Sequence, residues 1–377
     1  MPQRVLVVNH EASRSGAPTV AVQVLDALAA TGVVRVLVHR WRGPFRRQMD
    51  AHADVSAIEP FAVVRALARR WKPTRRLATF IECRAAGRVL DTHRPALVWC
   101  NTVLSANYIK AAQRRGIPVV LHAHEGYEDA ARVLGRYGLV GAGAAGVGGV
   151  TLVGCAREAA SGLARVIGVA DDSVVVLYSH VDLDEVDRFR RRSERIQPEL
   201  VRVVGCGQQL QTKGADEFDH IARELTTSRP RSVSFQWIGG ALGFFAADSP
   251  VRHLGPVPTA LSHFAEADIF ALTSRSDQFP LVVLEAMALG LAVVAFRVGD
   301  VAEQLGDTGV LIEPGDREAM AAAITRLIDD VDERRRLGAA ARRRAAELWG
   351  LAPFHARVRT IVAGAEAGRS TGSQTST

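Results

Sequence analysis

The sequence alternates between short apolar runs and longer amphipathic stretches, and it goes through this alternation twice. Apolar runs of strand type lie at residues 5–9, 33–39, 97–100, 118–122 and 150–154, and again at residues 200–204, 233–238, 269–273 and 292–296. Helices are expected between them, among others at residues 20–30, 216–226, 281–289 and 317–329. This order predicts an α/β fold in which parallel strands are covered by helices on both faces.

A chain of 377 residues is long for one domain, so two domains are expected. Residues 182–198 are highly charged and end in a proline, which is typical of a linker. We therefore predict two Rossmann-like, doubly wound parallel-sheet domains that face a central cleft. The predicted boundaries are an N-terminal domain at 1–180, a linker at 181–198, a C-terminal domain at 199–350, a helix at 351–363 that crosses back to the first domain, and a disordered tail at 364–377.

The positive charge is concentrated near the N-terminus. Residues 1–115 hold 19 Lys and Arg against 7 Asp and Glu, whereas residues 181–377 hold 24 against 27. Residues 41–47 and 61–76 carry most of the excess, and the second of these segments mixes cations with large apolar side chains. A solvated helix with an apolar inner face is the commoner origin of such a pattern, and contact with an anionic membrane or an acidic acceptor is the alternative. No nucleic-acid-binding motif accompanies the charge, so nucleic acid is not expected as a partner.

The four cysteines are widely spaced and show no metal-binding pattern, which favours a reduced, cytoplasmic protein without structural zinc. The N-terminus enters a strand directly and lacks the apolar core of a signal peptide. Residues 138–156 are free of charge over 19 positions, but seven of them are glycine. We interpret that segment as a loop that leads into a buried strand, because so many glycines make a poor helix. Peripheral association with the inner membrane face is kept as an alternative because the N-terminal part of the chain is basic.

Residues 273–290 (TSRSDQFPLVVLEAMALG) place two carboxylates, Asp277 and Glu285, around the start of a helix. Pro280 suits the first helical position because it has no N–H to satisfy there. The N–H groups of Leu281 and Val282 would then lack partners within the helix and could bind phosphate oxygens, with Glu285 one turn further on to accept ribose hydroxyls. An acidic N-cap before a core helix explains the same residues equally well.

Two further segments carry side chains suited to ligand binding. Residues 201–214 (VRVVGCGQQLQTKG) form a strand and a turn with Gly207 and Gln208, followed by Lys213, one of only three lysines in the chain. Lys213 can offer its charge to a phosphate, although it could equally be an incidental surface lysine. Residues 117–125 (IPVVLHAHE) end a strand with His122 and His124 on one side, either as structural histidines or as part of a metal site that lacks an evident third ligand.

The second half resembles the retaining glycosyltransferases of family 4, which have the GT-B architecture. That family shows a G-R-L-like turn followed by K-G, an E-x7-E element that continues into P-V-V, then G-G-x-x-E and T-G-x-L-x-x-P-G-D. The matching positions here are residues 207–214, residues 274–290 with Val293 and Val294, Gly299 with Glu303, and residues 308–316. The first half is similar more weakly, through SGAP at 15–18, the strand that ends in His124, and VLYSHVD at 176–182.

The resemblance implies transfer of a sugar from a nucleoside diphosphate sugar to an acceptor hydroxyl with retained configuration, in glycan, glycolipid or natural-product biosynthesis. The acceptor would be a sugar, a lipid-linked molecule or a small molecule, and neither a metal nor another cofactor is expected. The implied catalytic residues are His124, Lys213, Asp277 and Glu285. The implied donor-binding residues are Gly16, Gly207, Gln208, Lys213, Asp277, Phe279 (through its backbone), Pro280, Leu281, Val282 and Glu285.

The chain departs from the family pattern at three positions. Asp277 stands where the family has a glutamate, Gln208 where it has an arginine that helps to hold the diphosphate, and Asp300 where it has a second glycine. Two other functions are therefore retained as alternatives. One is a sugar-nucleotide epimerase or phosphorylase of the same architecture, and the other is a non-catalytic protein that binds nucleotide sugars.

Overall fold

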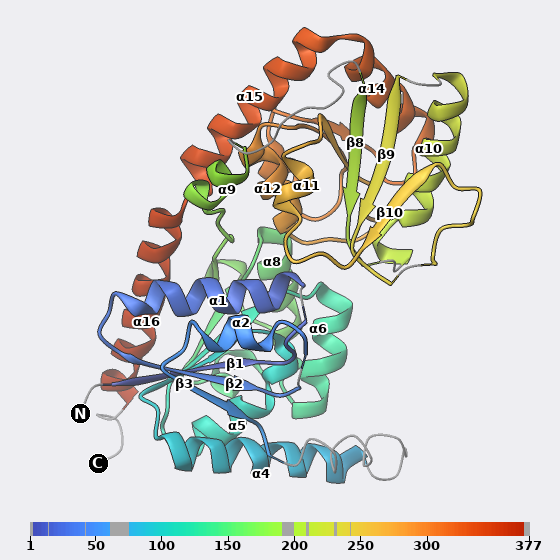
Figure 1. The fold of residues 1–377 in the computed structure, drawn as a ribbon. Coiled ribbons are helices and arrows are strands. Elements are labelled where there is room, and N and C mark those ends of the chain that lie inside the picture. The colour runs from blue at the N-terminus through green and yellow to red at the C-terminus, as the bar shows by residue number, and fades with distance from the viewer. Residues whose placement is uncertain are drawn as a thin grey trace. The chain divides into compact units, whose positions relative to one another are not determined.

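The computed structural model describes residues 3–13, 15–41, 43–60, 75–190, 200–208, 211–229, 232–241 and 243–372. The chain divides into two compact units (Figure 1): the N-terminal unit comprises Met1–Ser179 with Ala352–Thr377, and the C-terminal unit comprises His180–Leu351. The basic segment at residues 61–76 lies almost wholly outside the described residues. In the part of the chain that is described, no helix combines the length and apolar character needed to cross a membrane.

The described part of the N-terminal unit contains a seven-stranded parallel sheet in the order β3-β2-β1-β4-β5-β6-β7. Its strands are β1 (Arg4–Asn9), β2 (Val34–His39), β3 (Val55–Ile58), β4 (Leu97–Cys100), β5 (Val119–Ala123), β6 (Val150–Gly154) and β7 (Val174–Val176). Its helices are α1 (Gly16–Ala29), α2 (Arg46–Asp50), α4 (Arg75–His93), α5 (Asn107–Gln113), α6 (Tyr127–Leu134), α7 (Gly143–Gly146), α8 (Arg157–Ile167) and α16 (Leu351–Gly372). The short 3-10 helix η2 (Val103–Ser105) follows β4. The parallel α/β fold predicted from the sequence is confirmed for this unit.

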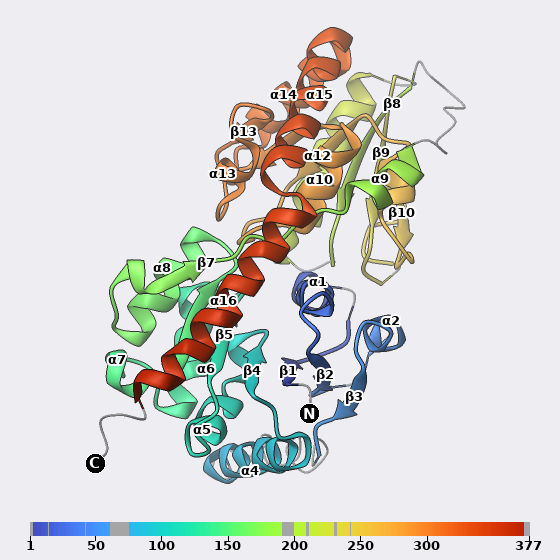
Figure 2. The ribbon, with the colours of Figure 1, turned by 90° about the vertical axis from the view of Figure 1, so that its left-hand side faces the viewer.

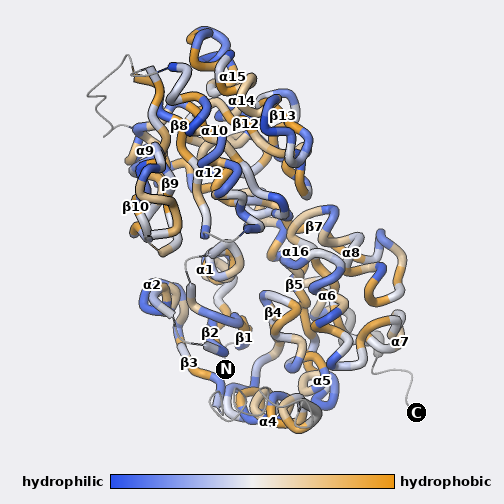
Figure 3. Tube along the Cα trace, turned by 90° about the vertical axis from the view of Figure 1, so that its right-hand side faces the viewer, coloured by the Kyte–Doolittle hydropathy of each residue, from blue (hydrophilic) through white to orange (hydrophobic). Residues whose placement is uncertain are grey.

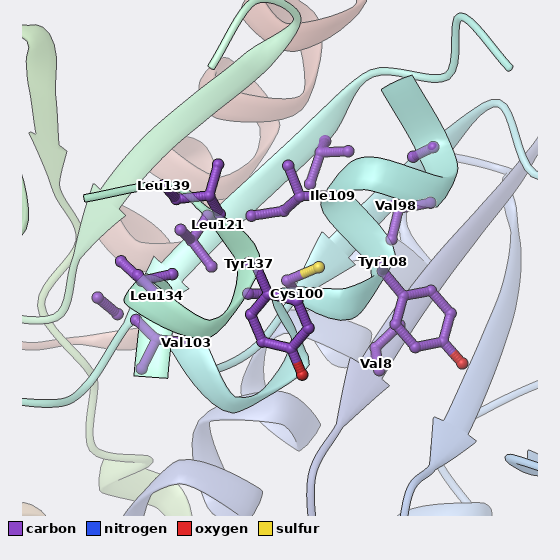
Figure 4. Close-up of a cluster of buried hydrophobic side chains, with 14 of the residues drawn as sticks. Val8, Val98, Cys100, Val103, Tyr108, Ile109, Leu121, Leu134, Tyr137 and Leu139 are labelled. Carbon is purple, nitrogen blue, oxygen red and sulfur yellow. The ribbon is translucent and has the colours of Figure 1, made fainter. Parts of the chain in front are cut away.

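Buried side chains from β1, β4, β5 and the helices that cover them form the core of this unit. Figure 4 shows aliphatic and aromatic members of this core, which include Val8, Val98, Cys100, Val103, Tyr108, Ile109, Leu121, Leu134, Tyr137 and Leu139. Every residue of the central strands β4 and β5 is buried, as expected for a parallel sheet that is covered on both faces.

The C-terminal unit contains, within its described residues, a six-stranded parallel sheet in the order β10-β9-β8-β11-β12-β13. The strands are β8 (Val201–Cys206), β9 (Val233–Ile238), β10 (Val251–Gly255), β11 (Ile269–Leu272), β12 (Ala292–Phe296) and β13 (Val310–Ile312). The helices are α9 (Leu183–Arg190), α10 (Ala215–Ser228), α11 (Leu261–Phe264), α12 (Leu281–Leu289), α13 (Val301–Leu305), α14 (Arg317–Asp329) and α15 (Val331–Leu348), with the 3-10 helix η5 (Gln211–Lys213). Hydrophobic and hydrophilic residues alternate along most helices (Figure 3), as expected where one helical face packs on a sheet.

Two predicted boundaries differ from the structure. The predicted linker begins with helix α9, because the Asp182 carboxylate accepts the N–H groups of Asp184 (2.9 Å) and Glu185 (3.1 Å) and caps it. The remaining linker residues, 191–198, lie outside the described part of the chain.

The predicted disordered tail is wrong for residues 364–372, because α16 extends to Gly372 (Figure 2). Val358, Ile361 and Ala365 recur at helical spacing and are all buried, so the apolar face of this helix continues past residue 363. The Gly, Ser and Thr content of the segment conceals that periodicity. Residues 373–377 lie outside the described part of the chain.

The segment at residues 138–156 folds as the sequence predicted. It contains only the single turn α7 and the strand β6, whose last three residues are buried. Gly138, Gly141, Gly143 and Gly149 all have positive φ, a conformation that a membrane-spanning helix would not allow.

Candidate functional site

The strand order of the C-terminal unit fixes where a ligand is expected to bind. The chain moves outward from β8 to β9 and β10 and then returns to the other side of β8 with β11. The loops that follow β8 and β11 therefore leave neighbouring strands in opposite directions, and parallel α/β sheets bind ligands in the crevice that such a switch point creates. The predicted residues Lys213 and Asp277 lie on these two loops.

Lys213 and Asp277 contact each other directly. The Lys213 ammonium lies 2.6 Å from the Asp277 carboxylate, with side-chain exposures of 31% and 18%. The pair is therefore half-buried but open enough for a ligand to reach both groups. A cation and a carboxylate at one position can bind a phosphate group and a sugar hydroxyl side by side.

The two loops are held together by contacts that leave little freedom. Gly214 has a φ of +65°, and a Cβ there would overlap the carbonyl oxygen of Thr273. The Thr273 hydroxyl in turn donates to the Gly214 carbonyl at 2.8 Å. Arg275 donates its backbone N–H to the Thr212 carbonyl at 2.8 Å and its guanidinium to both oxygens of Asp216 at 2.8 and 2.6 Å. Lys213 is thus presented from a rigid turn.

Glu285 lies one turn inside α12 and is partly buried. Within the described residues it has no hydrogen bond or ion pair, which is unusual for a carboxylate in this position. Burial, and secondarily the charge of Glu185 on α9, raises the pKa of Glu285 to about 7. A buried carboxylate that lacks a protein partner and has a perturbed pKa is a candidate for ligand binding.

The start of α12 faces the same loop. Pro280 is the N-cap and not the first helical residue, because its ψ of 119° is extended; this prediction was wrong by one position. The helix geometry leaves the N–H groups of Leu281 and Val282 without acceptors in the helix itself. The Phe279 side chain is buried, with its ring 5.2 Å from that of Trp349 in an edge-on contact, so Phe279 can present only its backbone to a ligand.

Gly207 and Gln208 follow β8 directly. The Gly207 carbonyl accepts the indole N–H of Trp237 at 3.1 Å, and its N–H donates to the Ile238 carbonyl at 2.9 Å, so its backbone is fixed to β9. The Gln208 side chain is exposed. An exposed side chain next to a fixed turn is available to a ligand, but it supplies no charge where the related family has an arginine.

The N-terminal unit has its own switch point, between β1 and β4. Gly16 begins α1 directly after the β1 loop, and the space where a side chain would stand is open. His124 follows β5, the neighbour of β4 in the sheet. The structure therefore places the two predicted residues of this unit at the carboxyl edge of its sheet, where ligands bind in folds of this class.

The His124 side chain is deeply set. Its ring centroid lies 4.3 Å from that of His122, and its Nε2 has no hydrogen-bond partner within the described residues. Burial, followed by the charge of nearby His10, lowers the pKa of His124 to about 3. His124 is therefore neutral at physiological pH and is suited to a hydrogen bond with a hydroxyl group, whereas its low basicity makes it a poor general base.

Two carboxylates of this edge had no role in the sequence-based prediction. One Glu125 oxygen accepts the N–H groups of His124 (2.9 Å) and Val103 (3.3 Å), so it joins the loops after β4 and β5 and fixes the backbone of His124. Glu11 accepts the Ser13 hydroxyl at 2.6 Å, and its contacts with His10, Ser13 and Ser15 lower its pKa to about 2. The order H-A-H-E at residues 122–125 can be read from the sequence, but the contact of Glu125 with Val103 on the loop after β4 cannot.

The H-x-H pair does not form part of a metal cluster within the described ranges. No group of three or more His, Cys, Asp or Glu side chains that could hold a metal ion is found there.

Comparison with known proteins agrees with this geometry. Residues 201–330 match the family model described as Glycosyl transferases group 1. Two curated relatives illustrate the similarity. A D-inositol 3-phosphate glycosyltransferase of Paenarthrobacter aurescens strain TC1 is 30% identical over 47% of this chain and 52% of its own length. An MMP alpha-(1->4)-mannosyltransferase of Mycolicibacterium hassiacum is 39% identical over 43% of this chain and 42% of its own length. The chain spans about half the length of the curated relatives it matches. The sequence-based resemblance to glycosyltransferases is confirmed.

Solved structures match nearly the whole fold. The Anabaena protein HepE, crystallised with UDP and glucose, superposes with a TM-score of 0.74 at 17% identity and covers 96% of this chain and 99% of its own. WaaG, a glycosyltransferase involved in lipopolysaccharide biosynthesis, gives a TM-score of 0.72 at 14% identity, with 96% and 100% covered. The predicted GT-B fold is therefore confirmed.

Proposed function

We propose that this protein is a retaining glycosyltransferase that moves a sugar from a nucleoside diphosphate sugar to a hydroxyl group of an acceptor. One observation carries the proposal: the Lys213–Asp277 pair lies at the switch point of the C-terminal sheet, next to a helix that contains Glu285, a carboxylate with no hydrogen bond or ion pair among the described residues. The match of residues 201–330 to the glycosyltransferase model supports it, as does the binding of UDP and glucose by the structural neighbour HepE.

The groups of the C-terminal unit correspond to the parts of such a donor. The ionised Glu285 accepts the two ribose hydroxyls, and Lys213 with the N–H groups of Leu281 and Val282 binds the diphosphate. Asp277 accepts hydroxyls of the transferred sugar. Within the N-terminal unit, the neutral His124 and the open backbone at Gly16 are suited to contacts with hydroxyl or phosphate groups of a substrate.

The transfer itself needs the enzyme to stabilise a leaving group. The bond between the anomeric carbon and the diphosphate oxygen breaks, and its electron pair goes to that oxygen. The acceptor oxygen forms the new bond on the same face of the sugar and passes its proton to the departing diphosphate. Lys213 and the helix N–H groups oppose the charge that develops on the diphosphate, and such fixed electrostatic stabilisation is usually the largest contribution to the rate.

The proposal is tested by incubating the protein with UDP-, GDP- and ADP-sugars and a panel of hydroxyl acceptors. We expect the release of one nucleoside diphosphate and a new glycoside whose anomeric configuration, determined by NMR, is that of the donor. Glu285→Ala should abolish both, whereas Glu313→Ala, at an exposed carboxylate of the same unit, should not. A product formed from the donor without an acceptor would identify an epimerase or phosphorylase, and nucleotide-sugar binding without turnover would identify a binding protein.

We further propose that the N-terminal unit binds an anionic membrane or lipid-linked acceptor through α4. On this helix Leu77 and Phe80 are 53% and 58% exposed, and the Arg84 guanidinium lies 5.8 Å from the Phe80 ring centroid. A helix face with exposed apolar side chains beside cations is suited to the boundary between anionic headgroups and acyl chains. The excess of Lys and Arg in residues 1–115 adds attraction to such a surface.

This contact predicts sedimentation of the protein with phosphatidylglycerol vesicles at low salt and progressive release as the salt concentration rises. The double variant Leu77→Ser, Phe80→Ser should lose most of the binding. Leu348→Ser removes a leucine of the C-terminal unit that is 45% exposed, and it should leave the vesicle binding unchanged. Equal binding to zwitterionic vesicles, or no binding at low salt, would contradict the proposal.

A further inference from the structure

Gln304 is a fully buried amide in α13, and its contacts lead to residues 277–280, the segment before α12 that is called the donor loop below. Its Nε2 donates to the Pro280 carbonyl at 3.0 Å, and its Oε1 has no hydrogen-bond partner in the described part of the chain. Because a carbonyl can only accept, the amide group must keep its NH2 toward Pro280. Burial of a polar side chain costs free energy, so a buried amide that makes one hydrogen bond to a helix N-cap indicates a specific role for that bond.

The residues just before Gln304 hold the same loop. Gly299 has a φ of +49°, and a Cβ there would overlap the carbonyl oxygen of Asp277. The N–H of Asp300 donates to the Gln278 carbonyl at 2.9 Å. The backbone carbonyls of Asp277, Gln278 and Pro280 are thus all in contact with the segment that ends at Gln304.

Helix α15 holds Gln304 in turn. The Arg344 guanidinium donates to the Gln304 carbonyl at 3.1 Å and to the Glu303 carbonyl at 2.7 Å. A Cβ at Gly306 would lie 2.8 Å from the Arg344 Cζ, so this contact too is close-packed. The support of the donor loop therefore extends from α15 through α13 to the N-cap of α12.

We propose that Gln304 is a positioning residue of the donor site, which holds the Pro280 carbonyl so that Asp277 and the first N–H groups of α12 meet the diphosphate sugar in the correct geometry. The inference rests on the proposed function. Without the hydrogen bond from the Gln304 amide, the Pro280 carbonyl lacks this partner and the loop can shift. Small displacements in a binding site have large effects. Glu285, one turn further into the helix, is much less affected.

This role predicts that Gln304→Met, which keeps the length and volume of the side chain, binds a nucleoside diphosphate on the order of tenfold more weakly than the unmodified protein. The affinity for the corresponding nucleoside, which lacks the phosphates, should change less than about twofold. Both affinities are measured by calorimetry with the best-bound member of the set UDP, GDP and ADP and with its nucleoside. Gln304→Leu serves as a second variant in case the methionine variant unfolds at a lower temperature.

Thr308→Val is the matched control, because the Thr308 hydroxyl bonds the Leu305 carbonyl at the end of the same helix without touching the donor loop. It should bind both ligands as the unmodified protein does. Equal weakening of nucleoside and diphosphate, no weakening of either, or the same loss in Thr308→Val would overturn the positioning role and leave the proposed function intact. Absence of nucleotide binding in the unmodified protein would instead remove the proposed function, and the positioning role with it.

Discussion

Replacing Glu285 by Gln is expected to weaken the binding of a nucleoside diphosphate about a hundredfold at pH 8. The ionised carboxylate can accept two ribose hydroxyls, and hydrogen bonds to a charged group contribute about 1.5–3 kcal/mol each. A glutamine keeps the shape of the side chain but loses the charge and one of the two acceptors. The measurement is a calorimetric titration of both proteins, with Glu313→Gln as the control at an exposed carboxylate.

The pH dependence gives this prediction a second, independent observable. Because burial and the charge of Glu185 raise the pKa of Glu285 to about 7, the side chain is ionised above that pH and protonated below it. The ionised form is the better acceptor, so nucleotide affinity should rise as the pH increases through about 7 and level off above it. Glu285→Gln should bind weakly with no such dependence.

The groups near Glu285 provide a test of the cause. Burial is the larger cause of the raised pKa of Glu285, and the charge of Glu185 on α9 adds to it. Helix α9 is tied to α12 by Arg342, whose guanidinium donates to Asp187 at 2.7 Å and also contacts the Ala288 carbonyl. Glu185→Gln should therefore move the midpoint of the affinity profile to lower pH, whereas Asp184→Asn on the same helix should not. An unchanged midpoint in Glu185→Gln would show that burial alone sets the pKa.

The central strands could be predicted from the sequence because they are continuous apolar runs. The segments at 97–100, 233–238 and 292–296 were predicted with the bounds that β4, β9 and β12 have. The edge strands β3, β7, β10 and β13 were missed, since β3 and β10 are partly exposed and β7 and β13 have only three residues each. Strand pairing of such short segments depends on neighbours that are distant in the sequence and leaves little local pattern.

The candidate donor residues could be named from the sequence for a different reason. Lys213, Asp277 and Glu285 belong to motifs with a fixed order and spacing, and the structure brings Lys213 and Asp277 into contact across 64 positions. Their supports are not visible in this way. Arg275 and Gln304 act through partners that lie on other loops, and neither their residue type nor their spacing signals a role. Contacts of this kind require the fold to be known.

Replacing Lys213 by Met is expected to lower kcat by about two to three orders of magnitude, the effect typical of removing one group that stabilises charge in a transition state. Negative charge develops on the leaving diphosphate, and Gln208 supplies none of the charge that an arginine would add there. Lys213→Arg retains the cation and should keep a substantial part of the activity. The measurement is the steady-state rate of nucleoside diphosphate release with saturating donor and acceptor, and a kcat within tenfold of the unmodified protein would contradict the role.

Because Lys213 and Asp277 form an ion pair, substitution of each partner is expected to affect ligand binding in a different way. A diphosphate competes with Asp277 for the Lys213 ammonium, which lies 2.6 Å from that carboxylate. Asp277→Asn should therefore strengthen the binding of the free nucleoside diphosphate, because it removes the competing charge, while it weakens the binding of the sugar donor by removing a hydroxyl acceptor. Lys213→Met should weaken both. If Asp277→Asn instead weakened the free diphosphate as much as Lys213→Met does, the carboxylate would serve mainly to hold the lysine in place and not to bind the sugar.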